Sequence, residues 1–199
     1  SSQLYHDSKV KSSQYGITAT AECDSVKMNQ RKNETVDKLR NGIEKLLVEK
    51  KVELVKGNAK AIDAHTVEVN GEEYITEKLL IATGSAPFLP KITGINSPYV
   101  NTSDDLLNRD NFDFDSLTII GGGVIGVEFA GIFLNLGKKV TIIEALDRLL
   151  PTSDSELSRG LKLNLTKLGA KIYLNEPVKE IRDNIVITDK QEIKSDLIL

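Results

Sequence analysis

Apolar residues recur near the start of the chain with the spacing of a helix. Between 26 and 50 they are interleaved with Lys, Glu, Arg and Asn, and the repeating set is Val36, Leu39, Ile43, Leu46 and Leu47. This pattern predicts an amphipathic helix that packs on a surface.

Shorter apolar runs follow and indicate strands. Alternating residues at 51–55 and 59–62 predict two of them. The runs at 66–69 and 72–75 are separated by Asn-Gly, which is a strong signal for a tight hairpin. The run Leu-Leu-Ile-Ala at 79–82 is continuously apolar and predicts a strand buried on both faces.

The second half of the chain alternates strand and helix patterns. A strand at 117–120, a helix at 124–136 and a strand at 139–143 form one βαβ unit, with Gly137 ending the helix. A second helix is expected from a capping box of Ser153 with Glu156. Its apolar stripe is Leu157, Leu161, Leu165 and Leu168, and Gly169 ends it.

The remaining runs complete an α/β fold of Rossmann-like type. A third parallel strand is expected at 171–174, a short antiparallel meander at 178–193, and a return to the parallel sheet at 196–199. Pro, Gly, Asn and Asp are frequent in 88–111, which indicates a connection between two lobes. We place the domain boundary near Ser103.

The sequence Gly-Gly-Gly-Val-Ile-Gly at 121–126 joins the first strand of the βαβ unit to its helix. Gly121 allows a tight turn, Gly123 leaves no side chain between a pyrophosphate and the backbone, and Gly126 lets the helix pack closely. The phosphate charge would face the helix N-terminus near Val124. This context predicts a dinucleotide site, and the alternative is a tight turn that binds nothing.

Glu144 ends the next strand of the unit. A dinucleotide-binding unit places the acid for the adenosine ribose at this point. A carboxylate there can accept hydrogen bonds from both ribose hydroxyls and would repel a 2′-phosphate. The sequence therefore favours NAD over NADP.

Composition narrows the function classes. The chain has 199 residues and a formal charge of −3, without a long Lys or Arg run, which argues against nucleic acid as a partner. No apolar stretch nears the roughly 18 residues of a membrane span and no signal peptide opens the chain, so a cytoplasmic setting is expected. The single cysteine, Cys23, excludes an internal disulfide and a paired-cysteine metal site. An apolar strand at the C-terminal end, 196–199, suggests a piece of a longer protein, because such a strand needs cover.

Two motifs in a fixed order carry a resemblance to a known family. They are Leu-Ile-Ala-Thr-Gly-Ser-Ala-Pro at 80–87 and Gly-Gly-Gly-Val-Ile-Gly-Val-Glu at 121–128. The chain resembles the FAD-dependent pyridine nucleotide-disulfide oxidoreductases over essentially its whole length, and within them the dihydrolipoyl dehydrogenases. The segments 52–59, 140–144 and 148–151 support this. The resemblance implies a partial FAD-binding domain at 1–103 and a nearly complete NAD-binding domain at 104–199.

The resemblance also implies roles for matching residues. Thr83, Gly84 and Ser85 match the segment that closes over FAD, and Ala59 matches a position whose backbone touches the flavin nucleotide. Without the resemblance, 83–85 would be a plain turn that ends a strand.

Other matching residues belong to an NAD site. They are Gly121, Gly122, Gly123, Val124, Ile125, Gly126, Val127, Glu128, Glu144 and Val178. The resemblance implies that Glu128 lies near the nicotinamide end and that the backbone of Val178 contacts the adenine end. The alternatives are an ordinary acid in the first helical turn and an ordinary core valine.

Other parts of the family's pattern do not occur in this sequence. The family's Cys-x4-Cys disulfide, its His-Glu pair and its first FAD-binding glycine motif have no match. Cys23 reads as an ordinary thiol, and His6 and His65 are expected to be exposed. The sequence therefore predicts no catalytic residue, and the match is to a central part of the family's chain.

The resemblance implies an enzyme that passes electrons from dihydrolipoamide through a disulfide and FAD to NAD. The implied partners are a lipoyl-bearing acyltransferase or a glycine cleavage carrier protein, with a homodimer as the assembly. Three alternatives stay open: an NADPH-linked reductase such as a glutathione or mercuric reductase, a nucleotide-binding module without redox chemistry, and a single-cysteine NADH oxidase or peroxidase. An NADPH-linked enzyme is expected to have arginine at the position of Glu144 or soon after it. In this sequence Glu144 is followed by Ala145 and Leu146.

Overall fold

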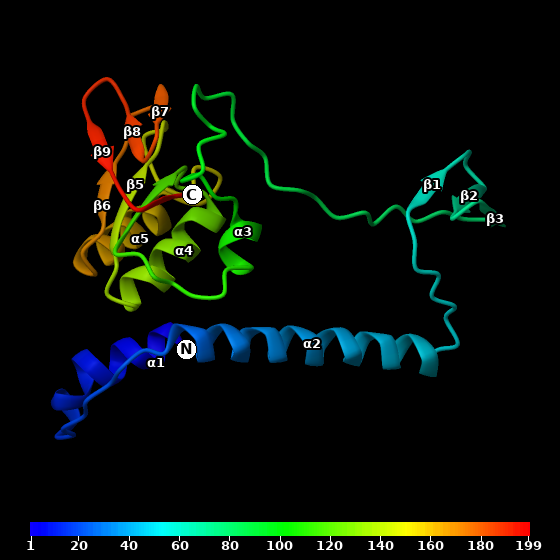
Figure 1. Cartoon of the computed structure of the whole chain (residues 1–199), viewed down its shortest axis with the longest axis horizontal. Helices are drawn as coiled ribbons and strands as arrows, with labels where there is room; N and C mark the ends of the chain where they lie inside the picture. Colours follow the sequence, from blue (N-terminus) through cyan, green and yellow to red (C-terminus); the bar gives the residue numbers. More distant parts are fainter. The chain divides into compact units, whose positions relative to one another are not determined.

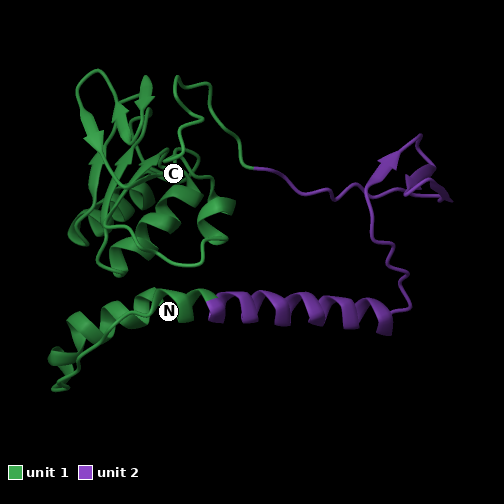
Figure 2. Cartoon of the chain, viewed as in Figure 1, with its two compact units in different colours: residues 1–29, 87–199 green, residues 30–86 purple.

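The computed structural model describes residues 1–199 and divides them into two compact units (Figure 2). Unit 1 consists of Ser1–Asn29 and Pro87–Leu199, and unit 2 of Gln30–Ala86. By its contacts, the chain returns to unit 1 at Pro87, ahead of the expected boundary near Ser103.

Unit 1 is built on a parallel sheet of four strands in the order β10-β4-β5-β6 (Figure 1). The strands are β4 Ser116–Ile120, β5 Lys139–Ile143, β6 Lys171–Tyr173 and β10 Leu197–Ile198. Helices α4 (Val124–Asn135) and α5 (Ser155–Lys167) connect β4 to β5 and β5 to β6. The predicted βαβ unit, the third parallel strand and the return of the chain to the sheet are confirmed.

Alternation along the strands explains the layers of unit 1. Leu117 and Ile119 of β4 face one side, where they pack in a core cluster with Phe133 of α4 and Leu165 of α5. Successive strand residues point to opposite faces, so Ile120 joins a second cluster on the other side with residues of the antiparallel meander. The sheet therefore has helices on one face and the meander on the other.

The meander forms a three-stranded antiparallel sheet, as predicted. Its strands are β7 Glu180–Arg182, β8 Ile185–Ile187 and β9 Glu192–Lys194. Asp183 adopts a φ of 54° in the turn between β7 and β8. Ile181 and Val186 point into the second cluster.

Four short helical segments were not predicted from the apolar pattern of the sequence. Three open the chain: α1 Ser2–His6, a π-helical turn at Asp7–Lys11 and a 3-10 turn at Ser12–Tyr15. The fourth, α3 Ser103–Leu107, follows a capping box of Thr102 with Asp105. His6 was expected to be exposed and is half-buried, because α1 packs on α4.

Unit 2 confirms the long helix and the hairpin. Helix α2 spans Ser25–Glu49 and begins in unit 1. Strands β1 Ala59–Ala61, β2 Thr66–Val69 and β3 Glu72–Ile75 pair antiparallel. Asn70 and Gly71 take φ values of 55° and 86°, the left-handed region that a tight hairpin turn needs. His65 is exposed, as expected.

None of the helices has the length and apolar content to cross a membrane.

Three expectations for these segments are wrong. The strands predicted at 51–55 and 79–82 do not form, and Leu80 is 88% exposed. The apolar face of α2 is not packed either, since Leu39 and Ile43 are 65% and 60% exposed. An apolar run shows that side chains favour burial, but a strand also needs a hydrogen-bonded neighbour, and within this chain these runs have none.

Helix α5 begins one residue later than its predicted cap implies. Its N-cap is Asp154 and not Ser153, because the Asp154 carboxylate accepts a hydrogen bond from Glu156 N–H at 2.8 Å. The expected apolar stripe is buried at Leu165, while Leu157 is 60% exposed.

Candidate nucleotide-binding site

The glycine turn has the geometry expected from its sequence. Gly121 adopts a φ of 102°, where a side chain would be strained, and its N–H donates to Ile143 O at 2.8 Å. A Cβ on Gly126 would overlap the carbonyl oxygen of Gly121 and lie 3.1 Å from Ile119 Cγ2. The turn is tied to the end of β5, and α4 starts in direct contact with it.

The N-terminus of α4 is open. Gly123 is its N-cap and forms no side-chain cap, and a Cβ on Gly123 would meet no atom within 4 Å. The first N–H groups of a helix have no acceptor within the helix. Open space in front of them, at the positive end of the helix dipole, suits an anionic group.

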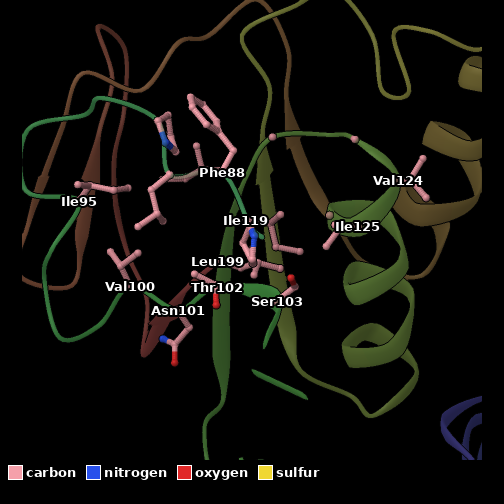
Figure 3. A pocket seen from close by; sticks show the side chains of 17 residues that line it. Phe88, Ile95, Val100, Asn101, Thr102, Ser103, Ile119, Val124, Ile125 and Leu199 are labelled. Atoms are coloured by element: carbon pink, nitrogen blue, oxygen red, sulfur yellow. The ribbon is translucent and has the colours of Figure 1, made fainter. Parts of the chain in front are cut away.

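A cavity of about 450 Å³ lies beside this helix N-terminus (Figure 3). Ile119 and Leu199 line it at the carboxyl ends of β4 and β10, together with Val124 and Ile125 of α4. Strand order reverses between β4 and β10, because β5 and β6 extend from the other side of β4. In open α/β sheets this is where ligands bind.

A second cavity, of about 550 Å³, lies at the opposite ends of the strands. Ser116, Lys139 and Lys171 line it at the amino ends of β4, β5 and β6. None of the residues of the glycine turn borders it. The first cavity is therefore the better candidate for a nucleotide.

Glu144 lies behind the glycine turn and is only 7% exposed. Its Oε2 accepts the N–H of Gly122 at 2.6 Å, and its Oε1 accepts the N–H of Leu146 at 2.7 Å. Its own N–H donates to Tyr173 O at 2.9 Å, and its carbonyl accepts the N–H of Glu176 at 3.0 Å. Four hydrogen bonds thus fix this residue against the turn, and the carboxylate keeps further lone pairs for a ligand.

The other residues expected at an NAD site take different positions. Val127 is buried in the first core cluster, where it positions α4. Glu128 is exposed and does not line the cavity. Val178 is half-buried and packs against the second cluster, two residues before β7. The structure thus places Gly121, Gly123 and Gly126 in the lining of the cavity. Gly122 contacts Glu144, and Glu144, Glu128 and Val178 all lie outside the lining.

The residues that match an FAD segment belong to unit 2. Ala59 is the first residue of β1, while Thr83, Gly84 and Ser85 lie outside any strand. All four are exposed. Gly84 has a φ of 71°, and a Cβ there would meet no atom within 4 Å.

Part of the cavity wall is formed by residues 100–103. The sequence predicted this segment only as part of the connection between two lobes. Val100, Asn101, Thr102 and Ser103 line the cavity. Val100 forms a parallel bridge with Ile198, and the N–H of Asn101 donates to Ile198 O at 2.7 Å. The Thr-x-x-Asp capping signal at Thr102 is the sequence feature that indicates an ordered segment here.

The parallel sheet, the glycine turn and the buried acid at the end of β5 define a Rossmann-like nucleotide-binding unit. A family model described as pyridine nucleotide-disulphide oxidoreductase matches residues 5–199, and the chain belongs to this family. Members of the family use FAD and NAD(P).

Individual relatives differ in their activities. A dihydrolipoyl dehydrogenase from Acholeplasma laidlawii is 39% identical over 199 residues, which cover 95% of this chain and 59% of the relative. The HOCl-induced flavoprotein disulfide reductase RclA from Escherichia coli matches in structure with a TM-score of 0.79 and 33% identity, over 99% of this chain and 45% of that chain. A water-forming NADH oxidase from Lactobacillus brevis, bound to NADH, matches with a TM-score of 0.61 and 30% identity, over 71% of this chain and 35% of that chain. The chain therefore spans roughly half the length of the proteins it matches.

Proposed function

We propose that unit 1 binds NAD in a flavin-dependent disulfide oxidoreductase of the dihydrolipoyl dehydrogenase type. The observation that carries this proposal is the buried carboxylate of Glu144, held on Gly122 of the glycine turn. A negative charge at this point accepts hydrogen bonds from a ribose diol and repels a 2′-phosphate.

Each part of the site has a role in this proposal. The pyrophosphate lies against the backbone at Gly121–Gly126, where Gly123 leaves space. The ribose hydroxyls donate to Glu144, and the backbone of Val178 contacts the adenine end. Glu128 lies towards the nicotinamide end, one turn into α4.

We assign the flavin contacts to Ala59, Thr83, Gly84 and Ser85. The left-handed backbone of Gly84 and the open space around it allow the chain to approach a ligand closely. Residues 1–103 would then be part of an FAD-binding domain and residues 104–199 most of an NAD-binding domain.

The bound cofactors supply the hydride and disulfide chemistry, while the protein binds and orients them. We propose dihydrolipoamide as the reductant because of the similarity to the Acholeplasma laidlawii enzyme. A lipoyl-bearing acyltransferase or a glycine cleavage carrier protein would present it to a homodimer.

A second candidate is another activity of the same family. The similarity to RclA and to an NADH oxidase favours a disulfide reductase or an oxidase on the same scaffold. Turnover with dihydrolipoamide and NAD, compared with NADH consumption under oxygen, separates these activities in the protein that contains this chain.

The NAD assignment is tested by measuring the affinities of NAD and NADP by calorimetry. We expect the wild-type protein to bind NAD at least about tenfold more tightly, since hydrogen bonds to a charged group contribute about 1.5–3 kcal/mol. Glu144→Arg should weaken the binding of NAD and shift the preference towards NADP. Glu156→Gln, at an exposed acid in the first turn of α5, is the matched control and should change neither affinity. An unchanged ratio of NAD to NADP affinity in Glu144→Arg would exclude the assigned role.

A further inference from the structure

Unit 1 contains a second buried carboxylate close to the candidate site. Glu176 follows β6 and is 4% exposed. Its Oε1 accepts the hydroxyl of Thr188 at 2.6 Å, and Thr188 is itself 7% exposed. Because a buried carboxylate is unfavourable without hydrogen bonds, this contact is a specific feature of the fold.

Thr188 organises the turn between β8 and β9. Its Oγ1 accepts the N–H groups of Lys190 at 3.1 Å and Gln191 at 2.9 Å. An ion pair of Lys179 with Asp189 joins the same two parts of the chain. The Glu176 carboxylate therefore ties the loop after β6 to the meander.

The backbone of the same loop contacts the residue that we assign to the ribose. The N–H of Glu176 donates to the carbonyl of Glu144 at 3.0 Å, and the N–H of Asn175 donates to Leu146 O at 2.8 Å. Asn175 has a φ of 53°, so the loop turns sharply at this point. A continuous set of hydrogen bonds thus runs from Thr188 through Glu176 and Glu144 to Gly122.

We propose that Glu176 is a positioning residue for the adenosine half of the nucleotide. Through Thr188 it holds the loop 174–178, and through its N–H it holds Glu144. The same loop carries Val178. This inference rests on the proposed NAD function, and it assigns to Glu176 an effect on ligands that contain adenosine.

The test compares ligands that contain different halves of NAD, titrated into the protein and followed by NMR. Glu176→Ala removes the carboxylate that accepts the buried hydroxyl of Thr188. This variant is expected to bind ADP-ribose and AMP about tenfold more weakly than the wild type. Nicotinamide mononucleotide, which lacks adenosine, should bind with unchanged affinity. Glu176→Gln keeps an acceptor oxygen and should bind ADP-ribose like the wild type.

A second pair of variants keeps Glu176 in place. Thr188→Val removes the hydroxyl that contacts Glu176 and should weaken ADP-ribose selectively, whereas Thr188→Ser keeps it and should not. In the double variant Glu176→Ala/Thr188→Val the two effects should not add, because both act through one contact. This pair tests the inference even if Glu176→Ala does not fold.

Two results would overturn the positioning role. One is an unchanged affinity for ADP-ribose in Thr188→Val or in a folded Glu176→Ala. The other is an equal loss of affinity for ADP-ribose and nicotinamide mononucleotide, which is what a general loss of structure produces. If the wild-type protein binds none of these ligands, the proposed NAD function itself fails, and the role of Glu176 with it.

Discussion

Two glycines of α4 occupy opposite steric environments. Gly126 faces the glycine turn, where a Cβ would overlap the carbonyl oxygen of Gly121. Gly131 lies in the same helix, and a Cβ there would meet no atom within 4 Å. The glycine at 126 is therefore a requirement of packing, and the glycine at 131 is not.

We predict that Gly126→Ala destabilises the protein by about 1–3 kcal/mol, the usual effect of overpacking, and weakens NAD binding. Gly131→Ala is the matched control and should stabilise the protein by about 0.5–1 kcal/mol, because alanine favours a helix interior. Urea unfolding measures both changes. Equal stability changes in the two variants would show that close packing at Gly126 is not required.

Residues differ in how far the sequence predicts their roles. The steric roles of Gly121 and Gly126 are predictable because a fixed spacing joins strand, turn and helix. Glu144 is predictable because it ends the next strand. Glu176 is not, because a carboxylate between Asn175 and Pro177 resembles a surface residue, and its burial depends on the distant Thr188.

At the scale of elements, the two-residue strand β10 is held to β4 by a side chain. Asp196 Oδ2 accepts the N–H groups of Asp115 and Ser116 and the hydroxyl of Ser116, each at 2.9 Å. The hydrogen bond from Asp115 N–H, followed by those from Ser116, lowers the pKa of Asp196 below its ordinary value. The carboxylate therefore links the amino ends of β10 and β4 by hydrogen bonds.

This lowered pKa predicts a pH-dependent stability. Because the carboxylate has a lower pKa in the folded state, its contribution is present above the unfolded pKa of about 3.9 and is lost as pH falls through the folded pKa. Asp196→Asn should therefore be less stable than the wild type at pH 7, and the difference should shrink as the pH falls below 4. Urea unfolding at several pH values checks this, with the exposed Asp113→Asn as a control that should show no difference. A difference in unfolding free energy between Asp196→Asn and the wild type that stays constant with pH would contradict the role of the Asp196 charge.

Elements were predictable where the chain itself supplies their neighbours. The strands β4, β5, β6 and β10 follow the apolar pattern because each pairs within unit 1. The run at 79–82 has a similar pattern but no partner strand, and its Leu80 and Ile81 are 88% and 71% exposed. The short helix α3 depends on a cap and not on apolar spacing, so the pattern does not reveal it.

At the scale of the whole molecule, burial differs sharply between the two units. Unit 1 contains both core clusters. In unit 2, Val69 is the one buried apolar side chain. Small antiparallel sheets with so little burial are marginally stable, so the hairpin of unit 2 should open far more often than the parallel sheet of unit 1.

Hydrogen exchange followed by mass spectrometry can test this difference and the flavin assignment together. We expect amides of β4 and β5 to exchange on the order of a thousandfold more slowly than those of β1–β3, because local opening free energy falls with burial. Added FAD should slow exchange at Ala59 and 83–85, since ligand binding stabilises the bound conformation. The meander strands β7–β9 are the internal control and should not change with FAD. Protection by FAD in the meander, with none at 83–85, would place the flavin contacts outside the residues that we assign to them.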